Sequence, residues 1–81
     1  MARVLLEICC GSLDDALEAG AGGADRVELC SSLFHGGLTP SFGALVEAKA
    51  RLDIPVVFMA RPRGGGFCYT APEMAAMERD T

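Results

Sequence analysis

The sequence predicts an α/β fold built on parallel strands, and three observations lead to this prediction. Short apolar runs of strand length occupy residues 4–9, 26–30 and 54–60. Between and after these runs, apolar residues recur at helical spacing behind clear helix-start signals. The connections are short, and strands that alternate with helices in this way lie parallel through right-handed crossovers.

The first β/α unit opens with residues 4–9, an apolar run with one interruption, which is typical of a strand buried on both faces. Ser12 then fits a helix N-cap, with Asp14 and Asp15 in the first turn, where the helix dipole favours negative charge. The glycine-rich residues 20–23 end this helix. Its apolar stripe consists of Leu13, Ala16 and Leu17.

The second and third units follow the same plan. Residues 26–30 form the second strand, and Thr39-Pro40-Ser41 signals the start of the second helix. Residues 54–60 are rich in β-branched side chains and predict the third strand. Thr70 and Glu73 form a capping box that opens a third helix. The apolar stripe expected on the second helix consists of Phe42, Leu45, Val46 and Leu52.

Composition narrows the class of protein. A chain of 81 residues with 51% hydrophobic and 22% charged residues is expected to form one globular domain at most. Its net charge of −4, with seven dispersed Lys and Arg, argues against a nucleic-acid partner. No apolar run approaches the roughly 20 residues of a membrane span, and Glu7 interrupts the first run before a signal-peptide core could form. We therefore expect no membrane association and a cytoplasmic location.

The four cysteines are expected to be reduced thiols. Three of them lie in or at the end of apolar runs, whereas disulfide frameworks belong to secreted, loop-rich chains. The sequence has no Cys-x-x-Cys pair, so it gives little support to a structural zinc site. We interpret Cys10 and Cys68 as packing residues.

A repeat singles out the other two cysteines. Residues 6–9, Leu-Glu-Ile-Cys, and 27–30, Val-Glu-Leu-Cys, match at a spacing that places both motifs at equivalent points of adjacent β/α units. Side chains alternate across a strand, so each motif places its Glu and Cys on one face and its apolar residues on the face that meets the helices. A buried carboxylate needs a partner, and we expect Arg61, at the end of the third strand, to pair with Glu7 or Glu28.

The polar residues admit more than one interpretation. Glu7 and Glu28 either form an internal ion-pair layer with arginines, or one of them acts as a general base or substrate anchor. Cys9 and Cys30 are either small buried residues or a thiolate pair suited to Cu(I), a soft ion that prefers sulfur. His35 is either a solvated loop residue or a metal ligand or proton carrier.

The glycine segments permit two interpretations as well. Residues 36–37 and 64–66 either bind an anion through backbone amides or serve only as turns. Neither matches a nucleotide fingerprint, so no nucleotide cofactor is expected.

Several motifs together resemble the CutC family in order and spacing. They are Leu6-Glu7-Ile8-Cys9, Gly23-Ala24-Asp25-Arg26-Val27-Glu28-Leu29-Cys30, Gly36-Gly37-Leu38-Thr39-Pro40-Ser41 with Gly43, Ile54-Pro55-Val56 and Arg61-Pro62-Arg63-Gly64-Gly65. The resemblance runs from about residue 4 to about residue 79.

The resemblance implies a TIM-like (β/α)8 barrel, of which residues 1–81 would supply the N-terminal part with the first three β/α units. It also implies a cytoplasmic location, dimeric assembly and a role in copper homeostasis, with Cu(I) bound at Cys9 and Cys30. A barrel of this kind needs about 250 residues, so three units cannot close it. The open sheet edges then favour assembly with other chains, including a homo-oligomer.

Three hypotheses about function follow. The first is a cytoplasmic copper homeostasis protein that binds copper as Cu(I) at Cys9 and Cys30. The second is a TIM-barrel enzyme of unknown reaction on a small anionic substrate, with Glu7, Glu28 and Arg61 as catalytic candidates. The third is an inactive truncated fragment.

Overall fold

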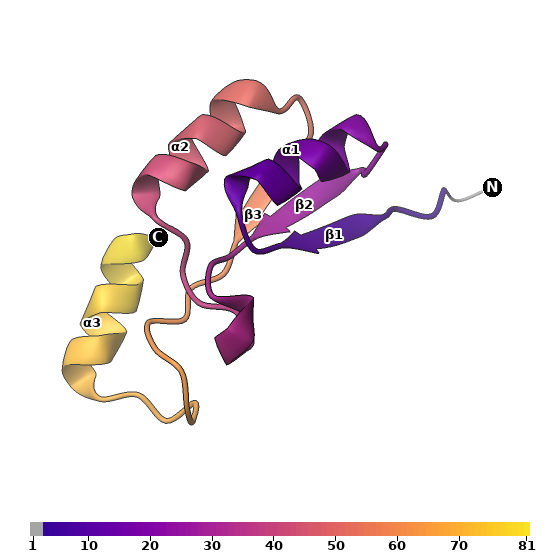
Figure 1. Cartoon of the computed structure of the whole chain (residues 1–81). Helices are drawn as coiled ribbons and strands as arrows, with labels where there is room; N and C mark the ends of the chain where they lie inside the picture. Colours follow the sequence, from indigo (N-terminus) through magenta and orange to yellow (C-terminus); the bar gives the residue numbers. More distant parts are fainter. Residues whose placement is uncertain (1–2) are drawn as a thin grey trace.

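The computed structural model describes residues 3–81, in which strands and helices alternate as the sequence predicts (Figure 1). In chain order the elements are β1 (Glu7–Cys10), α1 (Leu13–Ala21), β2 (Arg26–Leu29), the short 3₁₀ turn η1 (Leu33–His35), α2 (Phe42–Arg51), β3 (Val56–Phe58) and α3 (Ala71–Asp80). The strands form one parallel sheet in the order β1-β2-β3. The α/β prediction is therefore confirmed.

The strands are shorter than the apolar runs that predicted them. β1 begins at Glu7, opposite the first residue of β2, and the exposed residues 4–6 precede it. β3 covers only Val56–Phe58 of the predicted run 54–60. A strand extends only as far as a neighbour supplies backbone partners, and β2 is itself four residues long. The apolar runs located the strands but not their ends.

The helix starts agree with the capping signals. Ser12 and Ser41 each accept a hydrogen bond from the backbone amide three residues later. At α3 the Thr70 hydroxyl accepts from the Glu73 amide, while the Glu73 carboxylate accepts from the Thr70 amide. These contacts are local, and local side-chain chemistry determines them.

The core lies between the sheet and its first two helices. α1 packs on β1 and β2, and α2 packs on α1 and β3. Val27 and Leu29 of β2 have no exposed surface and point toward these helices, together with fully buried Ala16 of α1. Figure 1 shows both helices on the same side of the sheet. Within residues 3–81, no helix packs across the opposite face of the sheet.

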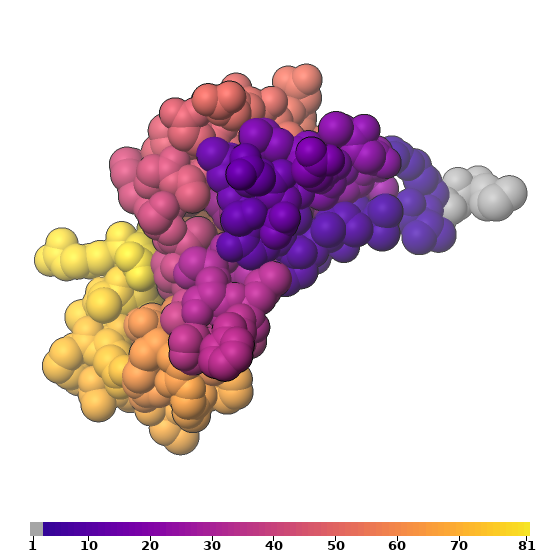
Figure 2. Space-filling view, viewed as in Figure 1, coloured from indigo at the N-terminus to yellow at the C-terminus, as the bar shows by residue number. Residues whose placement is uncertain are grey.

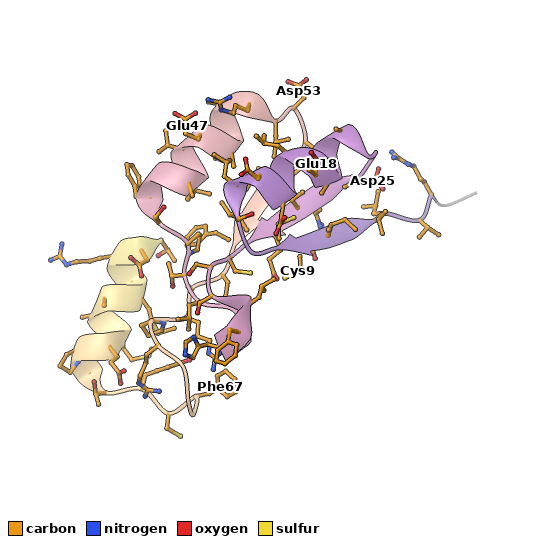
Figure 3. All side chains as sticks on the ribbon, in the orientation of Figure 1. Cys9, Glu18, Asp25, Glu47, Asp53 and Phe67 are labelled. Atoms are coloured by element: carbon orange, nitrogen blue, oxygen red, sulfur yellow. The ribbon has the colours of Figure 1, made fainter. Side chains whose placement is uncertain are left out.

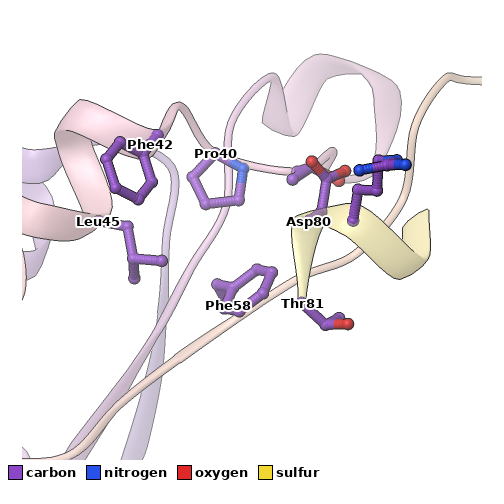
Figure 4. Close-up of a pocket in the computed structure, with 8 residues that line it drawn as sticks. Pro40, Phe42, Leu45, Phe58, Asp80 and Thr81 are labelled. Atoms are coloured by element: carbon purple, nitrogen blue, oxygen red, sulfur yellow. The ribbon is translucent and has the colours of Figure 1, made fainter. Parts of the chain in front are cut away.

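The predicted apolar stripe of α2 is only partly correct. Leu45 and Leu52 pack against the core, but Phe42 is 81% exposed and Val46 is 47% exposed. Phe42 and Val46 are therefore not among the residues that pack against the core. Phe42 lines a cavity of about 260 Å³ together with Phe58 and the end of α3. Figure 4 shows these residues around it.

The residues after β3 gather at the carboxyl end of the sheet. Figure 2 shows them, orange to yellow, at one end of the molecule beside the loop that follows β2. α3 lies apart from the sheet, beyond that loop (Figure 1). None of the helices in residues 3–81 is long and apolar enough to cross a membrane.

Candidate metal centre

The face of the sheet left uncovered by the helices carries the polar residues of β1 and β2. In the pairing of the two strands, Glu7 lies opposite Arg26 and Cys9 lies opposite Glu28. Alternate residues share a face, so Cys30 points the same way as Glu28. Figure 3 labels Cys9 on the side of β1 away from α1. The common face predicted for the two Glu-x-Cys motifs is confirmed.

The two cysteines of this face are in contact. The Sγ atoms of Cys9 and Cys30 lie 3.7 Å apart. Cys30 is 1% exposed, and its thiol donates a hydrogen bond to the backbone carbonyl of Cys10 at 3.3 Å. Cys9 is exposed. The pair therefore has one fixed, buried sulfur and one sulfur that solvent and small ions can reach.

The surroundings of Cys9 favour the protonated thiol. Its pKa is raised from the ordinary value of 9.0 to about 12. The largest cause is the hydrogen bond with Cys30, followed by desolvation and then by the hydrogen bond with the Glu28 carboxylate. A thiolate at Cys9 would add negative charge beside that carboxylate. A bound cation would offset this charge repulsion.

Glu28 completes a group of three possible ligands. One carboxylate oxygen of Glu28 and the sulfurs of Cys9 and Cys30 all lie within 4.8 Å of one another. Glu28 is half-buried, and no arginine, lysine or histidine in residues 3–81 forms an ion pair with it. Thiolate and carboxylate are both metal ligands, and a half-buried carboxylate gains from a cation partner.

The partner predicted for the carboxylates was wrong. Arg61 does not pair with Glu7 or Glu28, because its guanidinium donates instead to backbone carbonyls. Nη1 donates to the carbonyls of His35 and Gly37 at 2.6 and 3.1 Å, and Nη2 donates to that of Gly65 at 3.1 Å. Glu7 is paired with Arg26 at 3.0 Å. Arg61 thus joins the loops that follow β2 and β3.

The other nominated residues lie outside the cluster. Cys10 is buried in the core between sheet and helices, as predicted, whereas Cys68 is exposed and the packing role expected of it was wrong. His35 is exposed in η1, and its Nδ1 is hydrogen-bonded to the Ser32 hydroxyl at 2.6 Å. Arg63 is bound to Glu73 and to three loop carbonyls, so the arginine beside the glycine segment 64–66 already has partners.

Sequence reasoning missed Met59, which lies just beyond β3 on the same side as the cysteines. A Cβ placed on Gly37 would lie 3.0 Å from the sulfur of Met59 and 3.6 Å from the sulfur of Cys30. Both sulfurs therefore pack against one glycine, which has φ of +98°. The only sequence signal was the apolar run 54–60, whose alternation places Met59 on the face of Val57 and Glu28.

A parallel α/β sheet with thiols and a carboxylate grouped near the carboxyl ends of its strands defines an α/β protein with a candidate metal centre. The chain belongs to the CutC family, whose model matches residues 4–81.

Individual relatives agree with this family assignment. A family protein CutC of Pectobacterium atrosepticum is 55% identical over 75 residues, which make up 93% of this chain and 30% of the relative. The corresponding protein of Klebsiella pneumoniae subsp. pneumoniae is 54% identical over 76 residues, which make up 94% of this chain and 31% of the relative.

A solved structure resembles the same part of the chain. It is the crystal structure of CutC from Streptococcus agalactiae, which carries a provisional description as a copper homeostasis protein. It has a TM-score of 0.86 and 41% sequence identity, and the match covers 96% of this chain and 39% of that one. This chain therefore spans well under half the length of the relatives it matches.

Proposed function

We propose that this chain serves copper homeostasis by binding Cu(I) through the thiolates of Cys9 and Cys30. The observation that carries the proposal is the 3.7 Å separation of the sulfur of Cys9, in β1, from that of Cys30, which directly follows β2. Cu(I) is a soft ion that prefers thiolate and thioether ligands, and the Met59 thioether lies against the same glycine as Cys30. The description of the Streptococcus agalactiae relative supports the same role.

The proposed setting of this site is a (β/α)8 barrel. Residues 1–81 would form its N-terminal part, with three β/α units, and the cluster would lie near the carboxyl ends of the strands, where barrel proteins place their sites. The uncovered face and the open edges of β1 and β3 support this setting, because further strands would cover them. A cytoplasmic location is part of the proposal, since reducing conditions keep such thiols available for Cu(I).

Binding of Cu(I) must displace the thiol protons. The pKa of Cys9 is about 12, so its proton remains in place at neutral pH until a metal competes for the sulfur. The apparent affinity should therefore rise by about tenfold per pH unit for this proton alone. Cys30 also gives up its hydrogen bond to the Cys10 carbonyl, a loss of about 1 kcal/mol.

A competition titration tests the proposal. Cu(I) is titrated into the chain against a Cu(I) chelator of known affinity, under reducing conditions without oxygen. We expect one Cu(I) per chain, and we expect Cys9→Ser combined with Cys30→Ser to abolish this binding. Cys68→Ser removes a thiol of the chain outside the cluster and should leave the affinity unchanged. Equal Cu(I) affinity in the double variant and the wild type would refute the assignment.

A further inference from the structure

The separation of the sulfurs carries information about the number of ligands. With a metal–sulfur bond of about 2.3 Å, two sulfurs on opposite sides of one ion lie about 4.6 Å apart, whereas two sulfurs of a tetrahedral site lie about 3.8 Å apart. Cys9 and Cys30 have their sulfurs 3.7 Å apart. This spacing suits a site in which further ligands complete the coordination.

Glu28 is placed to be such a ligand. It lies opposite Cys9 and two residues before Cys30, so both thiols approach its carboxylate from the same face of the sheet. Glu7, the other carboxylate of this face, is already paired with Arg26 at 3.0 Å. The two glutamates of the repeat therefore differ, because one is neutralised and the other has no cation among residues 3–81.

We propose that Cys9, Glu28 and Cys30 together form a site for a divalent ion of the zinc type, with the Glu28 carboxylate as the third protein ligand. Two thiolates and one carboxylate carry three negative charges, which a divalent ion balances better than a monovalent one. Zinc accepts both sulfur and carboxylate oxygen, and three protein ligands with a water in the fourth position is an arrangement that it uses. Binding releases the protons of both thiols to solvent.

This inference rests on the proposed function only in sharing its two cysteines. Cu(I) favours soft sulfur and gains little from a carboxylate, whereas a divalent ion of intermediate softness gains from both ligand types. Glu28 is thus the residue that separates the two metals. Removal of its carboxylate should lower the affinity for the divalent ion and leave the affinity for Cu(I) unchanged.

The experiment uses Co²⁺ as a spectroscopic substitute for Zn²⁺. Co²⁺ is titrated into the reduced 81-residue chain in the Cys68→Ser background, and the thiolate-to-cobalt absorption band reports binding. Zn²⁺ is then added in competition. Glu28→Gln should lower the affinity for both ions by about tenfold or more, because a ligand is lost. The matched control is Glu7→Gln, which removes the paired carboxylate of the same face and should leave the affinity unchanged.

Each outcome has a distinct meaning. Unchanged Co²⁺ and Zn²⁺ affinity in Glu28→Gln would overturn the role of Glu28, and the Cu(I) titration of the same variant would still test the copper proposal. Cu(I) that fails to bind while Co²⁺ binds and depends on Glu28 would overturn the copper proposal alone. Circular dichroism checks the fold of each variant. Glu28→His supplies a different ligand at the same position, so Co²⁺ binding by this variant with a shifted absorption band would support a ligand role for residue 28, and binding with an unshifted band would count against it.

Discussion

Gly37 is the residue where a single methyl group should disturb both the fold and the candidate metal centre. Its φ is +98°, a backbone conformation that residues with a side chain rarely adopt. A Cβ at this position would lie 3.0 Å from the Met59 sulfur, 3.2 Å from its methyl carbon and 3.6 Å from the Cys30 sulfur. Gly37→Ala therefore combines an unfavourable backbone conformation with a contact closer than ordinary packing.

The expected cost follows from these two terms. Placing an L residue in the left-handed region costs about 1–2 kcal/mol, and shifting Met59 to relieve the contact adds to this. We expect Gly37→Ala to lower the free energy of unfolding by about 2 kcal/mol, which is a large part of the stability of a small domain. Urea unfolding followed by circular dichroism at the helix band measures it.

The matched control is Gly43→Ala in α2. Its Cβ would meet no heavy atom within 4 Å, and its backbone is helical. Alanine there should raise the free energy of unfolding by about 0.5 kcal/mol or slightly more. The same substitution thus has opposite signs at the two glycines. A Gly37→Ala variant that is as stable as the wild type, or more stable, would refute the packing described around Cys30.

Three further predictions concern the parts of the fold that support the site. The pKa of Glu73 is held below its ordinary 4.5, chiefly by the hydrogen bonds from Arg63. The pair therefore stabilises the fold above pH 4.5, and this stabilisation is lost as the pH falls through the lowered pKa. In Glu73→Gln, the urea midpoint should depend less on pH in this range than it does in the wild type. Leu29→Ala should lower the free energy of unfolding by about 3 kcal/mol, because Leu29 is fully buried. In the same assay, Val46→Ala at an exposed position should change the free energy of unfolding by less than about 0.5 kcal/mol. Arg61→Lys keeps the charge but removes the guanidinium group that donates to three backbone carbonyls. The amides of residues 31–38 should therefore exchange hydrogen faster than in the wild type. Unchanged protection of these amides would show that Arg61 does not hold this loop.

The sequence predicted features that depend on near neighbours. Ser12, Ser41 and the pair of Thr70 and Glu73 mark helix starts because a capping side chain bonds to an amide three residues away. The period-2 alternation likewise predicted that Val27 and Leu29 face the helices. Both kinds of pattern depend on a few consecutive residues, so they can be recognised without knowledge of the rest of the fold.

The partners of Arg61 could not be predicted in this way. Its donors reach the carbonyls of His35 and Gly37, which lie more than twenty residues earlier in the chain. Every residue has a backbone carbonyl, so the sequence does not indicate which carbonyls an arginine will bind. A carboxylate can be identified from the sequence, and charge pairing therefore favoured Glu7 or Glu28 as the partner. The exposure of Cys68 was missed for a related reason, since its loop is held by Arg63 contacts with backbone carbonyls.

The most consequential fact that the sequence does not contain is the register of β1 and β2. The repeat aligns Cys9 with Cys30, but the sheet places Cys9 opposite Glu28. Because of this offset of two residues, the carboxylate of the second motif lies beside the thiol of the first, and Cys30 approaches diagonally to bring its sulfur 3.7 Å from that of Cys9. In the aligned register each motif would face its own copy, with sulfur opposite sulfur and carboxylate opposite carboxylate. The offset instead groups two sulfurs and one oxygen, and it leaves the other carboxylate, Glu7, to Arg26. Strand stagger, which closes a barrel geometrically, would thereby also set the ligand composition of the proposed site.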